Sequence, residues 1–486
     1  MNFHSLEYLV FLPAVVALHF ATPHRFRWLV LLTASYVFYA AWRVDFLWLL
    51  IISTLTDYWV GLRLEAAQTD RARKLILSAS LAVNLGLLFV FKYAVALWDG
   101  IGHLATALLD ADPAQFRHFD IILPLGISFY TFQTLSYTID IYRRRIPAER
   151  HLGYFALYVA FFPQLLAGPI ERASTLLRNL RARRRFDPAV IGPACFLITL
   201  GMAKKLVIAD RLGQTFVSIV QNPLHFDSLL VLLTPPATVY RYYCDLSGYA
   251  DIAIGSAMLF GIQLSPNFNR PFAASSTMRF WYSWHITVTA WFRDYLLRSL
   301  VKGGSIAASR PLALMITGLV IGLWHGPTLG WAIAGVSVGL LAIPESKWGR
   351  WRLRHGIRPH TAAQRFLWDW SGRLYVWGVV FFLIGMPLTW SNTEVLRHAL
   401  AQIAAMQLPD TVTMGQDSKE IWRSVSRIAL LVAALEIWQW QEARGWARQI
   451  AAALPLEARW LAATIFAIIV LVNANLSQDG FLYFKF

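Results

Sequence analysis

The chain has 486 residues, of which 57% are hydrophobic and 15% are charged. A soluble protein carries about 25% charged residues, whereas apolar runs close to the ~20 residues that cross a bilayer recur along this chain. The composition excludes a soluble enzyme and predicts an all-α, polytopic membrane protein. Because the runs are continuous and do not alternate, it also excludes a membrane β-barrel.

The net charge of +16 comes from basic residues that gather in short blocks between the apolar runs. These blocks lie at residues 71–74, 143–145, 181–185 and 347–358. Basic loops stay on the cytoplasmic side of a membrane, where they contact anionic lipid heads. We therefore place these four loops in the cytoplasm, expect membrane lipid as a partner, and expect no nucleic acid.

Four apolar runs open the chain, at residues 6–20, 28–41, 46–62 and 75–98. The first lacks a basic start and a cleavage site, so it is expected to be a membrane helix and not a removed signal peptide. The acidic loop at 99–120 is predicted to face the outside, as is the N-terminus, and the run at 121–141 returns the chain to the cytoplasmic side.

The run at 152–170 lies between two cytoplasmic loops and is interrupted by Pro163, Gly168 and Pro169. A segment that starts and ends on one side is predicted to be re-entrant. Irregular backbone at membrane depth is tolerated only where protein or a wet cavity surrounds it. This run therefore predicts a cavity.

The second half predicts a helix over 188–209, an irregular polar region over 234–272, and helices that carry His285 and His325. Further apolar runs follow at 331–343, 366–388, 428–440 and 460–472, and the acidic loop at 390–420 is predicted to lie outside. In total we expect about eleven to thirteen membrane-embedded helices, including re-entrant segments, in one integral-membrane domain over residues 1–486.

Two histidines in aromatic, apolar surroundings are the first candidates for chemistry: His285 follows Trp284, and His325 follows Trp324 between Gly322 and Gly326. An imidazole is the natural general base for a hydroxyl or thiol, because its pKa lies near working pH. The two glycines are expected to leave room for a substrate beside His325, our first choice for the base. His285 could orient a substrate, hold a proton or brace a helix contact, and a hydrogen-bonded core histidine remains the alternative.

Other kinds of site fit the sequence less well. It has no G-x-S-x-G elbow, phosphate-binding glycine loop or H-E-x-x-H motif. Two histidines could bind a metal, but a third ligand is missing from the spacing, so we expect no metal. Asp245 and Asp251 could form a carboxylate pair, but we expect them instead to cap a broken helix around Ser247 or to pair with Arg241. Arg293 and Asp294 are expected to form a local ion pair or a helix-end feature.

Seven motifs in order resemble the membrane-bound O-acyltransferase superfamily. They are LPLGISFYTFQ (123–133), FFPQLLAGPI (161–170), DLSGYADIAIG (245–255), NFNRP (267–271), WHIT (284–287), WFRDY (291–295) and GLWHG (322–326). The bacterial branch that acts in alginate O-acetylation is the most similar, and the branch that passes D-alanine to teichoic acids is a more distant relative. The resemblance covers most of the chain.

This resemblance implies helices around a central funnel or tunnel, with His325 as the essential histidine and His285 as a second site residue. It implies acetyl-CoA or another acyl thioester as donor substrate, with no bound cofactor. Polar and aromatic motif residues then become candidates to line the tunnel: Trp324, Trp284, Asn267, Asn269, Arg270, Ser128, Gln133, Asp245 and Ser247.

Our hypothesis is a bacterial inner-membrane acetyltransferase that passes an acyl group from the cytoplasm for O-acetylation of an exported polysaccharide. Its expected partners are an extracytoplasmic acyltransferase, the polysaccharide-synthesis machinery and an acyl carrier. One alternative acylates a lipid-linked sugar or glycolipid directly. Another, from a different class, is a solute transporter with a mid-membrane site between broken helices.

Overall fold

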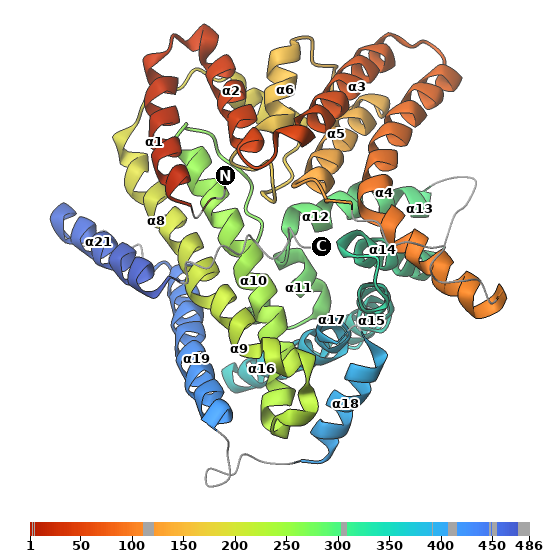
Figure 1. Cartoon of the computed structure of the whole chain (residues 1–486), viewed down its shortest axis with the longest axis vertical. Helices are drawn as coiled ribbons and strands as arrows, with labels where there is room; N and C mark the ends of the chain where they lie inside the picture. The colour runs from red at the N-terminus through yellow and green to blue at the C-terminus, as the bar shows by residue number, and fades with distance from the viewer. Residues whose placement is uncertain are drawn as a thin grey trace. The chain divides into compact units, whose positions relative to one another are not determined.

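The computed structural model describes residues 1, 3, 5–109, 121–302, 309–390, 392–406, 416–446, 449 and 454–474. Every regular element within these ranges is helical (Figure 1). The chain packs as two compact units. Unit 1 contains residues 1–195 and 252–266, and unit 2 contains residues 196–251 and the described residues from 267 onward.

Within the described residues, unit 1 is built from seven complete α-helices, the first residues of α8 (Ile191–Met202) and the end of α10 (Ser228–Met258). The seven complete helices are α1 (Leu6–Ala21), α2 (Arg27–Ala40), α3 (Leu47–Ala66), α4 (Asp70–Leu109), α5 (Ile127–Tyr142), α6 (Leu152–Ala160) and α7 (Ala173–Arg181). Ser5 caps α1 by accepting a hydrogen bond from the backbone N–H of Tyr8. The Tyr8 hydroxyl in turn lies 2.7 Å from that of Ser256, near the end of α10. This contact ties the first helix to residues far along the chain.

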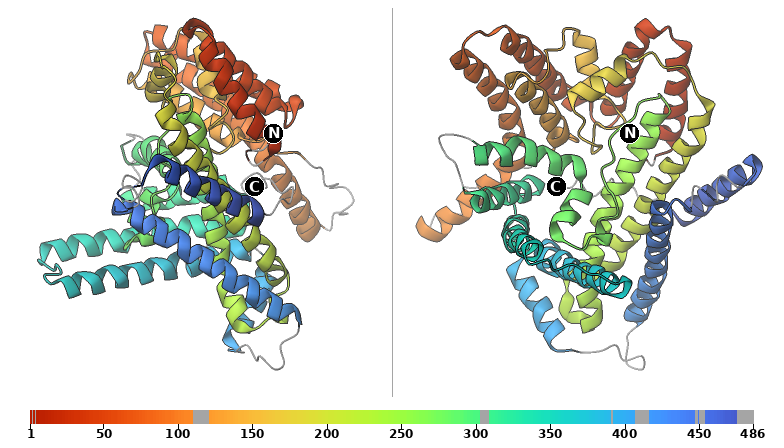
Figure 2. Two further views of the ribbon diagram at one scale, coloured as in Figure 1. Left: turned by 90° about the vertical axis from the view of Figure 1, so that its left-hand side faces the viewer. Right: turned by 180° about the vertical axis from the view of Figure 1, so that it is seen from behind.

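Unit 2 holds the remaining helices. Its first part comprises most of α8 (Ile191–Met202), a π-helical turn (Ala203–Ala209), α9 (Asp210–Gln221) and most of α10. After residue 267 come α11 (Thr277–Ser283), α12 (Ile286–Trp291), α13 (Arg298–Lys302), α14 (Arg310–His325), α15 (Leu329–Arg354), α16 (Ala362–Trp377), α17 (Gly385–Thr389), α18 (Thr393–Ala404), α19 (Gln416–Ala443) and α21 (Leu456–Asn473). In Figure 2, α15 and α16 run beside each other, and the Arg352 guanidinium lies 4.7 Å from the Trp368 ring centroid across this pair.

Five segments of the described chain are long and apolar enough to cross a bilayer: Val44–Ala66, Asp70–Thr106, Pro188–Gln221, Leu329–Arg354 and Ala362–Thr389. They contain the runs predicted at 46–62, 75–98, 188–209, 331–343 and 366–388. The prediction of an all-α, polytopic membrane protein is confirmed. The central tunnel stays a prediction.

Two loops predicted from charge are partly helical. Helix α4 continues to Leu109, so Asp99 belongs to it, while residues 110–120 lie outside the described chain. Helix α15 likewise continues to Arg354 and takes up most of the basic block at 347–358. The rule that basic residues stay on the cytoplasmic side applies to a loop and to the charged end of a long helix alike. Charge alone therefore does not locate the residue at which a helix ends.

The prediction of an irregular region over 234–272 is wrong for its first part, because α10 is one continuous helix to Met258. Residues of this region have packing partners that keep the helix continuous. Tyr240, Tyr243 and Cys244 belong to the core of unit 2, and a Cβ on Gly248 would come within 2.7 Å of the Gly201 carbonyl oxygen. Gly248 therefore permits a close helix contact and does not end the helix.

The run at 152–170 is helical only in α6, which ends at Ala160; the Pro- and Gly-containing residues 161–172 form turns and extended backbone. This agrees with the interruption predicted there. Its re-entrant course stays a prediction.

Candidate active site

His285 lies between α11 and α12 in a left-handed backbone conformation, with φ 45° and ψ 53°. Two backbone hydrogen bonds hold this turn to the segment at 267–269: Ile286 N–H to the Asn267 carbonyl at 2.8 Å, and Asn269 N–H to the Ser283 carbonyl at 2.9 Å. A non-glycine residue in this conformation persists only where its surroundings enforce it. The backbone at His285 is therefore strained in the conformation that positions this imidazole.

The side chain of Asn267 fixes the orientation of the His285 ring. Its Oδ1 accepts hydrogen bonds from the Thr287 N–H at 3.2 Å and the Thr287 hydroxyl at 3.0 Å, and it lies 3.3 Å from Nδ1 of His285. Because a backbone N–H can only donate, the Asn267 atom at this point must be the oxygen. His285 Nδ1 must then carry the hydrogen, so Nε2 is the acceptor nitrogen of the neutral ring.

His325 is the last residue of α14 and is half-buried. The Trp331 indole, from the first turn of α15, stacks on it with ring centroids 4.7 Å apart and planes 18° apart. The Trp324 ring lies 4.5 Å from the His325 ring at a tilt of 58°. The imidazole is therefore flanked by two indoles.

Trp324 brings the two predicted histidines together. Its ring lies 6.3 Å from that of His285 in an edge-to-face arrangement, in addition to its contact with His325. Trp324 and His285 are both only 3% exposed. One buried indole thus contacts both a buried imidazole and a half-buried imidazole.

The glycines around His325 accommodate a tryptophan, which differs from the prediction that they leave room for a substrate. A Cβ on Gly322 would overlap the Trp331 carbonyl oxygen, and one on Gly326 would come within 2.8 Å of the Trp331 indole Cδ1. Gly322 admits the backbone of Trp331, and Gly326 admits its ring.

Three other predicted residues of unit 2 have structural contacts. Trp284 stacks on Phe280 at 5.4 Å within a buried aromatic cluster. Asn269 is exposed and contributes its backbone N–H to the His285 turn. Arg270 adopts φ 49°, ahead of the short helix at Pro271–Ala273.

Asp245, Asp251 and Asp210 form a buried ionic cluster with two lysines of the π-helical turn. Lys205 Nζ lies 2.9 Å from Asp245 and 2.8 Å from Asp210, and Lys204 Nζ lies 2.6 Å from Asp251. The expectation that the aspartates cap a helix or pair with Arg241 is wrong, because these lysines are their partners. The predictions from the sequence did not include Lys204 and Lys205, although two adjacent charged residues inside an apolar run indicate that these side chains have partners or a function. The predicted pair of Arg293 and Asp294 is present, at 2.9 Å.

Ser128 and Gln133 lie in unit 1 on α5, and both are buried. The Gln133 amide nitrogen donates to the Tyr158 carbonyl, and its Oε1 accepts from the Gln164 amide at 2.9 Å. These bonds join the LPLGISFYTFQ and FFPQLLAGPI motifs inside unit 1. Gln133 therefore has a structural role there.

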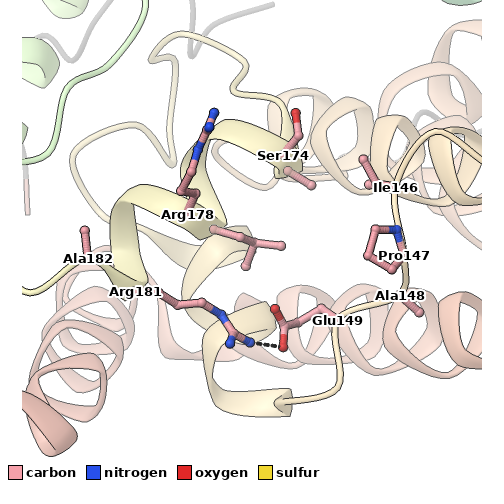
Figure 3. A pocket seen from close by; sticks show the side chains of 10 residues that line it. Ile146, Pro147, Ala148, Glu149, Ser174, Arg178, Arg181 and Ala182 are labelled. Atoms are coloured by element: carbon pink, nitrogen blue, oxygen red, sulfur yellow. Dashed lines mark hydrogen bonds and ion pairs between the residues drawn. The ribbon is translucent and has the colours of Figure 1, made fainter.

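A pocket of about 610 Å³ lies between α7 and the segment at 146–149 in unit 1 (Figure 3). Arg178 and Arg181 line it, and Arg181 forms an ion pair with Glu149. The sequence did not predict it. Elsewhere in unit 1, burial raises the pKa of the Glu171 carboxyl, and hydrogen bonds from Ser265 oppose this shift.

Among the described residues, no group of three or more His, Cys, Asp or Glu side chains could hold a metal ion. A site of this kind in a multi-pass helical membrane protein offers two imidazoles, an amide that orients one of them, and two indoles. These groups can move a proton and orient a reactant.

Comparison with known proteins places the chain in a class. The model of the MBOAT, membrane-bound O-acyltransferase family, matches residues 31–386. The chain belongs to this family and is an O-acyltransferase.

The chain is 39% identical over 444 residues to a probable alginate O-acetylase AlgI of Azotobacter vinelandii, covering 90% of this chain and 84% of the relative. It is 39% identical over 344 residues to the Pseudomonas aeruginosa protein of the same name, covering 70% of this chain and 65% of the relative. It is 29% identical to a peptidoglycan O-acetyltransferase of Helicobacter pylori, covering 77% and 73%. A teichoic acid D-alanyltransferase of Streptococcus thermophilus is 28% identical over 51% of this chain and 62% of its own length.

Proposed function

We propose that this protein is an O-acetyltransferase of the bacterial inner membrane that takes an acetyl group from a cytoplasmic thioester, acetyl-CoA, and passes it on for O-acetylation of an exported polysaccharide. The observation that carries the proposal is the contact of both histidine rings with Trp324 in a member of this family. An extracytoplasmic acyltransferase would complete the transfer to the polymer, and a carrier protein could deliver the acyl group.

The names of the relatives favour acetyl over D-alanyl as the group transferred. Two relatives named as acetylating alginate and one named as acetylating peptidoglycan match 70–90% of this chain. The D-alanyltransferase matches about half of it. All three acetylating relatives carry the name of an extracellular glycan or its acetylation, which supports an exported polysaccharide as the final acceptor.

The chemistry assigns each histidine a task. The half-buried His325 takes the proton from the acceptor hydroxyl as the hydroxyl oxygen attacks the thioester carbonyl carbon. The C–S bond then breaks, and the leaving thiolate receives the proton from the imidazolium. His285, with its Nδ1–H held by Asn267, keeps Nε2 as an acceptor that orients a donor group of a reactant.

Purified protein in lipid nanodiscs, incubated with radiolabelled acetyl-CoA, alginate oligosaccharides and the extracytoplasmic acyltransferase that completes the transfer, tests the proposal through the release of free CoA. We expect His325→Ala to reduce release of free CoA about 100-fold or more, the range that general bases contribute. His355→Ala is the matched control, because His355 is exposed just after the end of α15, where its ring contacts that of Trp351 at a tilt of 31°.

Equal CoA release by wild type and His325→Ala would remove His325 from this role. The lipid-linked sugar as acceptor is tested in cells that make both this sugar and the exported polymer. Acetyl label found in extracted lipid and not in the polymer would favour it.

A further inference from the structure

The turn between α14 and α15 brings Trp331 onto the face of His325. Helix α14 ends at His325, and α15 begins at Leu329, where the Thr328 hydroxyl accepts a hydrogen bond from the Trp331 N–H at 3.4 Å. This N-cap fixes the first turn of α15 and with it the position of Trp331. The backbone of this turn therefore sets the position of the Trp331 indole independently of the contacts that its side chain makes.

Trp331 contacts the aromatic rings of His325 and Tyr242. Its ring lies 4.7 Å from the His325 ring at 18°, and the Tyr242 ring of α10 meets it edge-on at 5.9 Å. Gly322 and Gly326 remove the Cβ atoms that would meet the Trp331 backbone and ring. The glycines of the GLWHG motif thus have one common neighbour, which is Trp331.

A parallel stack constrains an imidazole in a specific way. It fixes the plane of the ring, while both nitrogens remain at the ring edge, where they can reach a reactant. An indole face also attracts the positive charge that a base acquires when it takes a proton. The stack therefore suits a residue that must hold one orientation through a proton transfer.

We propose that Trp331 is a positioning residue for acyl transfer, which holds the ring plane of His325 through face-to-face stacking. This rests on the proposed function for the role of His325, and on ring geometry for the stack itself. Trp331 does not touch the reacting atoms in this assignment; it acts through His325.

The test compares Trp331→Phe, which keeps a flat aromatic ring, with Trp331→Leu, which keeps an apolar side chain without one. We expect kcat for acetyl-CoA consumption to fall about 10-fold or more in the leucine variant, because small misplacements of a catalytic group cost up to ~100-fold. KM should change little, and the phenylalanine variant should recover most of the rate. Trp348→Leu, on the same helix but 54% exposed, is the matched control and should retain the wild-type rate.

A second measurement does not depend on activity. Diethyl pyrocarbonate modifies accessible imidazoles, and peptide mass spectrometry reports its rate at His325 alone. A stacked ring is shielded on one face, so we expect several-fold faster modification in Trp331→Leu and a wild-type rate in Trp331→Phe. If Trp331→Leu fails to fold by thermal melting, Gly326→Ala serves instead, because its Cβ would displace the indole while leaving it in the chain.

If His325 is modified at the wild-type rate in the folded Trp331→Leu or Gly326→Ala variant, the proposed stack is contradicted. Faster modification with an unchanged kcat, or a phenylalanine variant as slow as the leucine variant, would overturn its role in positioning. If wild type consumes no thioester, the proposed function fails, and the modification rates still decide whether Trp331 holds His325.

Discussion

Asn267 shows how one side chain can decide the chemistry of a neighbour. Its Oδ1 faces a backbone N–H, a hydroxyl and an imidazole nitrogen. The Thr287 N–H can only donate, which identifies the Asn267 atom as the oxygen and so places the hydrogen on His285 Nδ1. The sequence predicts Asn267 to be one of the residues that line a tunnel. The structure shows a 2% exposed residue that shapes the His285 turn.

Asn267→Ala should reduce acetyl transfer about 10- to 100-fold, the usual cost of losing a group that orients a functional histidine. Asn267→Asp should retain most of the activity, because its carboxylate still accepts from Thr287 and from His285 Nδ1. Ser283→Ala is the control in the same turn, since the Ser283 hydroxyl bonds back to the Arg279 carbonyl. Rates from the nanodisc assay check this, and equal loss in the aspartate and alanine variants would contradict it.

At the scale of residues, the sequence singled out His285 and His325, and the structure brings both rings into contact with Trp324. An ionisable side chain in an apolar run carries an insertion cost, which makes it stand out in the sequence. The catalytic roles of the two histidines stay predictions. The sequence did not predict Trp331, because one more tryptophan among 21 has no distinguishing signal. The available clue was the pair of glycines, because a glycine permits close approach of a neighbouring segment.

Helices α14 and α15 owe their close packing to facing glycines. A Cβ on Gly318 would overlap the Gly335 carbonyl oxygen, and a Cβ on Gly335 would overlap that of Gly318. Small residues at a helix interface let two backbones approach within a membrane, where the hydrophobic effect does not drive helices together. This contact sets the distance between His325 at the end of α14 and Trp331 at the start of α15.

Gly335→Ala should lower stability by about 1–3 kcal/mol, the usual cost of overpacking, because the atom it meets belongs to the backbone and cannot rotate away. Gly349→Ala, in the same helix, has nothing within 4 Å of the added Cβ. It should be neutral or stabilising by up to about 1 kcal/mol, since alanine favours helix more than glycine does. Thermal melting of both purified variants checks this, and similar melting temperatures would argue against the close contact.

At the scale of elements, hydrophobic runs located the long helices well, because apolar length is what a bilayer selects. Helix α10 was missed. Its polar residues looked like breaks in the apolar pattern, but their partners, Lys204 and Lys205, lie about 40 residues away in the sequence. Pairing across such a distance is a tertiary property, and no local pattern reveals it.

For the whole molecule, charge predicts which side of the membrane each connection faces. In unit 2, the basic end of α15 is expected in the cytoplasm, and the acidic loop at 390–420, which includes α18, is expected outside. The described part of that loop supplies Glu394 in the first turn of α18.

Cysteines introduced one at a time test this membrane topology in spheroplasts of a bacterial host. With exposed Cys195 replaced by Ser and buried Cys244 kept, Glu394→Cys should react with a membrane-impermeant maleimide in intact spheroplasts. Arg350→Cys should react only after the membrane is permeabilised. Mass shifts of the labelled protein report both, and labelling of the two sites from the same side would refute the assigned topology.

The buried pairing of Lys204 with Asp251 and of Lys205 with Asp245 bears on how the protein enters its membrane. A lone charge at the centre of a helix costs about 2.5–3.5 kcal/mol on insertion. Asp210, in the same segment, already pairs with Lys205, so Lys204 is the charge that would oppose release of this segment from the insertion machinery into lipid. Release becomes favourable once α10 has been synthesised and Asp251 neutralises Lys204. Biogenesis of this protein should therefore pause with the segment at Pro188–Gln221 held beside the translocon until some forty further residues have emerged from the ribosome.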